Sequence, residues 1–167
     1  MAISYIPQPK ITCQDFINIL DRSTLGLRRP LADVEAMELM FQHGNVYVGA
    51  YDGDKLVGLA RVMTDFVFTS YLSDLAIDEA YQHQGIGKQL IKEVKHFIPR
   101  AKIILLAAPA AEQYYPKIGM QNHAHCYVLD QVDELKSFGI FFDFQTFCAF
   151  FRFENQIMIW QSTNNPN

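Results

Sequence analysis

The sequence has little positive charge and few cysteines, and each scarcity excludes a class of protein. Its 167 residues hold 14 Lys and Arg against 18 Asp and Glu, a net charge of −4. Nucleic-acid surfaces need clustered basic residues, and Arg28-Arg29 is the only basic pair of note, so we expect no nucleic-acid partner. The three cysteines are odd in number and far apart, which is not the pattern of a disulfide framework.

Long apolar runs are also missing. No stretch approaches the roughly 18 consecutive apolar residues that a membrane span needs, and the N-terminus lacks the basic and apolar regions of a signal peptide. We therefore predict a cytoplasmic protein with no membrane partner. The composition is that of a globular domain with a real core, since 50% of the residues are hydrophobic and 19% are charged.

The most informative segment is residues 75–91, which combines a short apolar strand, a loop with two glycines and an amphipathic helix. We expect the helix to begin at Gly87, and its apolar residues recur at spacings of four, four and three: Ile86, Leu90, Val94 and Phe97. A helix N-terminus has unpaired N–H groups and a partial positive charge, so it binds phosphate well. The segment therefore predicts an anion site.

Two common phosphate motifs do not match this segment. A nucleotide-triphosphate P-loop would need a glycine at Gln82 and a hydroxyl at Gln89. A dinucleotide fingerprint would need its third glycine at Leu90. Both kinds of nucleotide site are therefore disfavoured.

A third motif does match. The run Q-x-x-G-x-G at 82–87 resembles the acyl-coenzyme A signature of the GCN5-related N-acetyltransferases (GNAT). A second motif of that family, A-x-x-x-Y-x-x-x-G-[FM], matches Ala111, Tyr115, Gly119 and Met120 in the expected order after the first. Two motifs in the right order make the resemblance more specific than the glycine pair alone.

The resemblance implies the site residues and the cosubstrate. It implies that acetyl-coenzyme A binds through the strand and the glycine loop: Leu75, Ala76, Ile77, Gln82, His83, Gln84, Gly85, Ile86, Gly87 and Lys88. It also implies that Tyr115 protonates the leaving thiolate as general acid, and that no metal takes part. Two positions depart from the family: Ala108 stands where many members have asparagine, and Tyr71 where many have a glutamate base, so no base is assigned.

Four residues are candidates for the acceptor side of the site. Arg61 is polar in an apolar strand, and either pairs with a carboxylate or faces the acceptor. Asp74 is either an ordinary strand-end carboxylate or part of a proton path. Arg28 and Arg29 form either a solvated loop or, as the resemblance implies, a border of the acceptor site.

The predicted fold class is α/β, with a mixed, mostly antiparallel twisted sheet flanked by helices, as in the acyl-coenzyme A N-acyltransferases. In chain order, we expect a strand at 3–6, a helix from Thr12, a helix over 31–42 and strands at 46–51, 55–68 and 73–77. The helix at Gly87 follows, and after it we expect a strand at 102–108, a short helix with Tyr115 and a strand at 121–129. The alternating His123 and His125 in the last strand lack a further ligand at a zinc spacing, so no metal site is predicted.

Within one domain we expect an acetyltransferase core at 1–129 and a Phe-rich extension at 130–167. Eight of the 13 phenylalanines lie between Phe138 and Phe153. They either complete the sheet or form an interface, because exposed aromatic residues on this scale are a liability. We predict a homodimer whose interface includes part of 138–160.

The predicted function is transfer of acetyl from acetyl-coenzyme A to a primary amine, on a small molecule or a peptide, by direct attack on the thioester. The alternative is a module of the same fold that binds or senses acyl-coenzyme A without turnover. Such a module would keep residues 82–88 but would have no use for Tyr115, whose presence favours an enzyme.

Overall fold

The structure of the protein is a computed structural model that describes residues 2–136. The chain divides after Asn122 into two units, which are described separately. The Phe-rich segment from Phe138 to Phe153, and with it the predicted dimer interface, lies outside the described residues.

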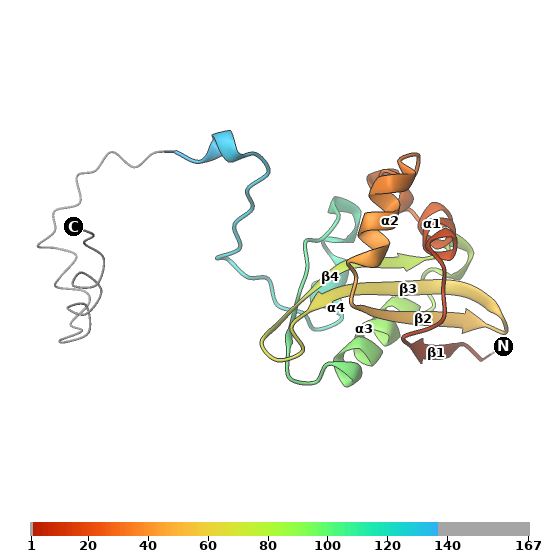
Figure 1. Ribbon diagram of the computed structural model, residues 1–167. Coiled ribbons are helices and arrows are strands. Elements are labelled where there is room, and N and C mark those ends of the chain that lie inside the picture. Colours follow the sequence, from red (N-terminus) through yellow and green to blue (C-terminus); the bar gives the residue numbers. More distant parts are fainter. Residues whose placement is uncertain (1, 137–167) are drawn as a thin grey trace, which may run out of the picture. The chain divides into compact units, whose positions relative to one another are not determined.

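A five-stranded sheet with the order β1-β2-β3-β4-β5 forms the centre of the first unit (Figure 1). The strands are β1 (Ser4–Pro7), β2 (Val46–Asp52), β3 (Lys55–Thr64), β4 (Thr69–Ile77) and β5 (Lys102–Ile104). The first four pair antiparallel, and β5 pairs parallel with β4. The mixed, mostly antiparallel sheet predicted from the sequence is confirmed.

Helices cover both faces of this sheet, with α1 and α2 on one side and α3 on the other (Figure 1). The helices are α1 (Cys13–Asp21), α2 (Val34–Gln42), α3 (Ile86–Phe97) and α4 (Tyr114–Lys117). Thr12 caps α1 as predicted, in a reciprocal capping box with Asp15. Helix α2 begins three residues later than expected because the side chain of Asp33 accepts the N–H of Ala36 and caps the helix there.

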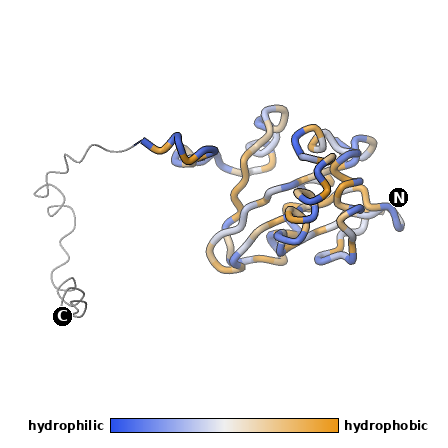
Figure 2. The backbone as a smooth tube through the Cα atoms, turned by 45° about the horizontal axis from the view of Figure 1, so that its top comes forward, coloured by the Kyte–Doolittle hydropathy of each residue, from blue (hydrophilic) through white to orange (hydrophobic). Residues whose placement is uncertain are grey.

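Each face of the sheet has its own hydrophobic cluster, and the strands between them are largely hydrophobic in Figure 2. On the α3 face, Leu90 and Val94 are fully buried. On the other face, Phe16 and Met37 bring α1 and α2 onto the sheet. The fold is therefore a three-layer sandwich.

A β-bulge at Ser73 interrupts the pairing of β3 with β4. Arg61 pairs with Asp74 and Val62 with Leu72, so Ser73 has no partner on β3. A bulge shifts the two-residue alternation of side chains by one position. As a result Leu72 packs in the α3 cluster, whereas Ala76 packs in the cluster of α1 and α2.

Several expectations about elements were wrong. The strand predicted at 55–68 ends at Thr64, and the strand predicted at 73–77 begins already at Thr69. Between them the carboxylate of Asp65 accepts three successive backbone N–H groups, from residues 67 to 69, in the turn that joins the two strands.

The strand predicted at 102–108 ends at Ile104. Residues 121–129 form no strand and are exposed, because alternation alone does not make a strand when the backbone finds no neighbouring strand in the described part of the chain. Phe97 was expected in the buried stripe of α3, but it is 41% exposed and Ile98 is buried in its place, since α3 ends at Phe97.

The described part of the second unit, residues 123–136, contains one short 3₁₀ helix, Val132–Glu134. His123 and His125 do lie together, with ring centroids 5.8 Å apart, and the His125 N–H donates to Nδ1 of His123. None of the helices within residues 2–136 is long and apolar enough to cross a membrane.

Candidate functional site

Side chains of the loop between β4 and α3 stabilise its conformation through hydrogen bonds to the backbone. Asp78 accepts the N–H of Ala80 and begins a 3₁₀ turn at Glu79–Tyr81. The side-chain amide of Gln82 then donates to the carbonyl of Ile77 at 3.2 Å, tying the loop to the end of the strand. Gln82 thus holds the loop from behind, and its backbone N–H is already bonded to the Glu79 carbonyl.

Beyond Gln82, the loop presents a row of unused donors. The backbone N–H groups from His83 to Lys88 donate to no acceptor within residues 2–136, and the first N–H bonded inside α3 is that of Gln89, to Gly85. Successive free N–H groups at a helix start form a concave site for an anion. Six of the seven loop residues predicted from the sequence, all but Gln82, therefore present free N–H groups, and this row is called the cradle below.

The two glycines of the cradle have different functions. Gly85 caps α3 with a φ of +82°, a left-handed conformation that favours glycine, and a side chain there would meet open space. Gly87 is needed for close packing: an added β carbon would lie 2.9 Å from the hydroxyl of Tyr114 and 3.6 Å from a methyl of Leu75. Gly87 thus marks the point where the cradle, β4 and α4 meet.

One edge of β4 is open next to this point. β5 pairs with β4 only from Thr69 to Tyr71, whereas β4 continues to Ile77. The predicted strand residues Leu75, Ala76 and Ile77 therefore have no strand partner on that side within residues 2–136. An extended ligand with amide groups can pair with such an edge in the way a strand does.

Two adjacent tyrosines on α4 complete this region. The rings of Tyr114 and Tyr115 lie edge to face with centroids 5.3 Å apart, and both are half-buried. Burial raises the pKa of Tyr115 above its usual value, and the neighbouring Tyr114 raises it further. Burial also raises the pKa of Tyr114. Both phenols therefore keep their protons near neutral pH, as a proton donor must.

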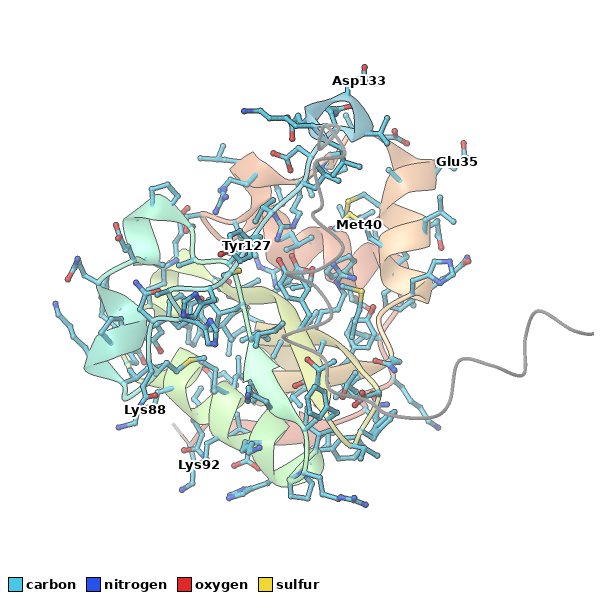
Figure 3. The ribbon with its side chains drawn as sticks, turned by 90° about the vertical axis from the view of Figure 1, so that its left-hand side faces the viewer. Glu35, Met40, Lys88, Lys92, Tyr127 and Asp133 are labelled. Carbon is cyan, nitrogen blue, oxygen red and sulfur yellow. The ribbon has the colours of Figure 1, made fainter. Side chains whose placement is uncertain are left out.

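A cavity of about 810 Å³ begins at the cradle and continues along α3. Its basic lining is Lys88, Lys92, Lys95, His96 and Lys102, and its apolar lining includes Ile91, Ile103, Ile118 and Met120. Lys88 and Lys92 extend from the same side of α3 (Figure 3). Lys88, Lys92 and Lys95 follow one another at spacings of four and three residues, which places them on one face of α3, and Lys102 joins them from β5.

Three of the four acceptor-side candidates form a buried ion cluster on the opposite face of the sheet. Nε of Arg29 lies 2.7 Å from Oδ1 of Asp74, and Nε of Arg61 lies 2.5 Å from Oδ2. The side chains of Arg61 and Asp74 are 4% and 1% exposed, and that of Arg29 is 19% exposed. The side chain of the fourth candidate, Arg28, makes no hydrogen bond to the described residues and is exposed.

No group of three or more His, Cys, Asp or Glu side chains that could hold a metal ion occurs within residues 2–136.

Comparisons with known proteins identify the family of the chain. The family described as "Acetyltransferase (GNAT) domain" matches residues 24–135, which include the cradle and both tyrosines. The chain belongs to the GNAT acetyltransferase family. The resemblance seen in the two sequence motifs is thereby confirmed.

Curated relatives match over shorter stretches. A soybean (Glycine max) protein named histone acetyltransferase TAP1 is 31% identical over 70 residues, covering 40% of this chain and 30% of that protein. A chloroplastic GCN5-related N-acetyltransferase of Arabidopsis thaliana is 33% identical over 70 residues, covering 40% and 27%. The matched stretch thus spans less than a third of the length of either relative.

Solved structures match over more of the chain and show the same fold. A GNAT-family acetyltransferase from Streptococcus pneumoniae has a TM-score of 0.63 at 23% identity, covering 80% of this chain and all of that one. An aminoglycoside acetyltransferase from an uncultured soil sample, solved with sisomicin, has a TM-score of 0.54 at 20% identity, covering 77% and 97%. The fold is that of the acyl-coenzyme A N-acyltransferases.

Proposed function

We propose that the protein is an acetyl-coenzyme A-dependent N-acetyltransferase that acetylates a primary amine. The observation that carries the proposal is the row of free N–H groups from His83 to Lys88 at the start of α3. A pyrophosphate is the anion of the right charge and size for such a row. The lysines along the adjoining cavity supply positive charge for a further phosphate of the same cosubstrate.

The open edge of β4 supports the same assignment. A pantetheine arm contains two amides, and the unpaired edge at Leu75–Ile77 offers N–H and C=O groups at strand spacing. The thioester that the cosubstrate supplies would then lie beyond the cradle, towards α4. The residues fit the cosubstrate because the lysines, the free N–H groups and the open strand edge are available for one phosphate, the pyrophosphate and the amide arm respectively.

The chain's own contribution to the chemistry is orientation and one proton. Held by the cradle and β4, the thioester is presented to an amine that has lost its proton. An alkyl amine in water has a pKa of about 10.4, so a base or a water chain must accept that proton. Tyr115 gives its phenol proton to the departing sulfur, and the raised pKa keeps that proton in place until transfer.

A thiol-release assay with acetyl-coenzyme A and a panel of amines tests this function. The panel includes sisomicin, a lysine-containing histone peptide and simple alkyl and aryl amines, because relatives are named for acetylation of aminoglycosides and histones. We expect amine-dependent thiol release with at least one class. Binding of acetyl-coenzyme A by calorimetry without release in any class would instead indicate the sensing module, and absence of both would overturn the proposal.

A further inference from the structure

The cluster of Arg29, Arg61 and Asp74 is placed where the sheet opens. The bulge at Ser73 lies two residues after Tyr71, the last residue of β4 that pairs with β5. The open edge at Leu75–Ile77 begins two residues after the bulge. Residues 75–77 stay paired with β3 on their other side, so a contact that fixes Ser73 contributes to how the open edge continues beyond the part of β4 that pairs with β5.

The two arginines donate hydrogen bonds to different atoms of the bulge residue. Nη2 of Arg61 donates to Oγ of Ser73 at 2.8 Å, and Nη2 of Arg29 donates to its carbonyl oxygen at 2.9 Å. The carboxylate of Asp74, the next residue, accepts a hydrogen bond from Nε of each arginine. The backbone carbonyl of the bulge residue therefore has a donor in Arg29, and its hydroxyl has one in Arg61.

The arginines also connect the bulge to the helical layer. Nη1 of Arg61 donates to the carbonyl of Met40 at the end of α2, and its guanidinium lies 5.5 Å from the ring centre of Phe16 in α1. Nη1 of Arg29 donates to the carbonyl of Arg28, in the connection between α1 and α2. A planar guanidinium with several fixed donors can make such contacts at once, which an ammonium group cannot.

We propose that Arg29 is a positioning residue that fixes the β4 bulge and thereby holds the Leu75–Ile77 edge in the geometry that the pantetheine arm requires. The inference rests on the proposed function. It gives Arg29 no contact with the cosubstrate: Arg29 acts through the Ser73 carbonyl and Asp74. Because Arg61 remains on Asp74, loss of Arg29 leaves no uncompensated buried carboxylate, and the fold persists.

Comparing the affinities for two ligands distinguishes a positioning role of Arg29 from a general loss of structure. Acetyl-coenzyme A uses both the cradle and the β4 edge, whereas 3′-phosphoadenosine 5′-diphosphate keeps the phosphates and lacks the pantetheine arm. In Arg29→Gln we expect the Kd of acetyl-coenzyme A to rise on the order of tenfold and that of the fragment to stay within about twofold. Arg29→Lys, which keeps the charge but cannot reach both acceptors, should recover part of the loss.

Arg100→Gln is the control, since Arg100 is exposed and makes no hydrogen bond to the described residues. Calorimetry on the full chain gives both affinities, and thermal unfolding checks the fold. Equal weakening of both ligands, or an unchanged ratio of the two affinities in Arg29→Gln, overturns the inference. If that variant does not fold, the same ratio measured in Arg29→Lys decides. A wild-type chain that binds neither ligand refutes the proposed function instead.

Discussion

The hydroxyl of Tyr114 occupies the space beside Gly87, so that a β carbon at Gly87 would stand 2.9 Å from the phenol oxygen. This contact joins the first turn of α3 to α4. It explains why a glycine is needed at a helical position that has no left-handed φ. It also means that a change at Gly87 affects the cradle in two ways, through its own side chain and through the displaced ring of Tyr114.

We predict that Gly87→Asp abolishes detectable binding of acetyl-coenzyme A while the fold persists. The new carboxylate repels phosphate at the row of free N–H groups, and its β carbon pushes Tyr114 away. Gly87→Ala brings only the steric effect, and we expect affinity to fall on the order of tenfold. Calorimetry with acetyl-coenzyme A measures both.

The steric part of this prediction has its own control. Tyr114→Phe removes the oxygen that Gly87→Ala would meet, so the double variant should regain part of the affinity lost by Gly87→Ala. Tyr114→Phe alone should bind nearly as the wild type does. An affinity of Gly87→Asp equal to that of the wild type would falsify the assignment of the cradle.

The second prediction concerns Tyr115. Tyr115→Phe keeps the ring and its edge-to-face contact with Tyr114 but loses the proton donor. We expect acetyl-coenzyme A to bind as before and kcat to fall on the order of 10²-fold. Steady-state kinetics with the best amine of the panel checks this, and Tyr5→Phe, which removes another partly buried phenol with a raised pKa, is the matched control.

The pH profile adds an independent check on Tyr115. Burial raises the pKa of this phenol above the usual 10.0, so the protonated form is present at all pH values below that. Activity should therefore not fall because of Tyr115 between pH 7 and 9. An alkaline loss in that range that disappears in Tyr115→Phe would show that the phenol titrates far lower than its surroundings imply.

Local patterns were enough to predict the cradle. The buried residues Ile86, Leu90 and Val94 follow from helical spacing, the N-cap at Thr12 from its residue type, and the glycine loop from its position between a strand and a helix. Each of these depends on neighbours in the chain, which a sequence displays directly.

Features that depend on distant pairing were not predictable in the same way. The ion pair of Arg61 with Asp74 follows from the register of β3 on β4, which the bulge at Ser73 sets. Without that register, pairing with a carboxylate and facing the acceptor are equal alternatives for Arg61. The strand expected at 121–129 was wrong for a related reason, because a strand depends on a partner that its own sequence does not contain.

The third prediction is a homodimer, and its main grounds lie outside the described residues. Eight phenylalanines within 138–153 must be buried, since a fully buried ring stabilises by roughly 1.5–3 kcal/mol and exposed rings promote association. Adjacent pairs such as Phe141-Phe142 point to opposite sides of an extended chain, so one core does not readily accept both. The monomer has a mass of 19.2 kDa. Light scattering of the full chain at micromolar concentration should give twice that mass. A monomer whose 138–160 segment resists proteolysis would contradict this.

The fourth prediction concerns the stability of the strand end that leads into the cradle. Asp78 is buried, and burial alone would raise its pKa. The overall pKa is nevertheless lowered, because the carboxylate accepts hydrogen bonds from Lys55, from the N–H of Ala80 and from Arg22. A carboxyl group whose pKa is lower in the folded chain stabilises that chain above the unfolded pKa, about 3.9, and loses its contribution as the pH falls through the folded pKa.

Asp78→Asn should therefore lower the free energy of unfolding at pH 7 by about 1–2 kcal/mol, because both cations lose their charged partner while the amide oxygen can still accept the N–H of Ala80. The difference from the wild type should remain constant down to about pH 5 and shrink below pH 4, where the wild-type carboxylate takes up a proton. Urea unfolding at pH 7, 5, 4 and 3 measures this, with the exposed Asp54→Asn as control. A difference that stays the same at pH 3 would mean that the charge of Asp78 contributes nothing, and that only its shape and hydrogen bonds hold the start of the cradle loop.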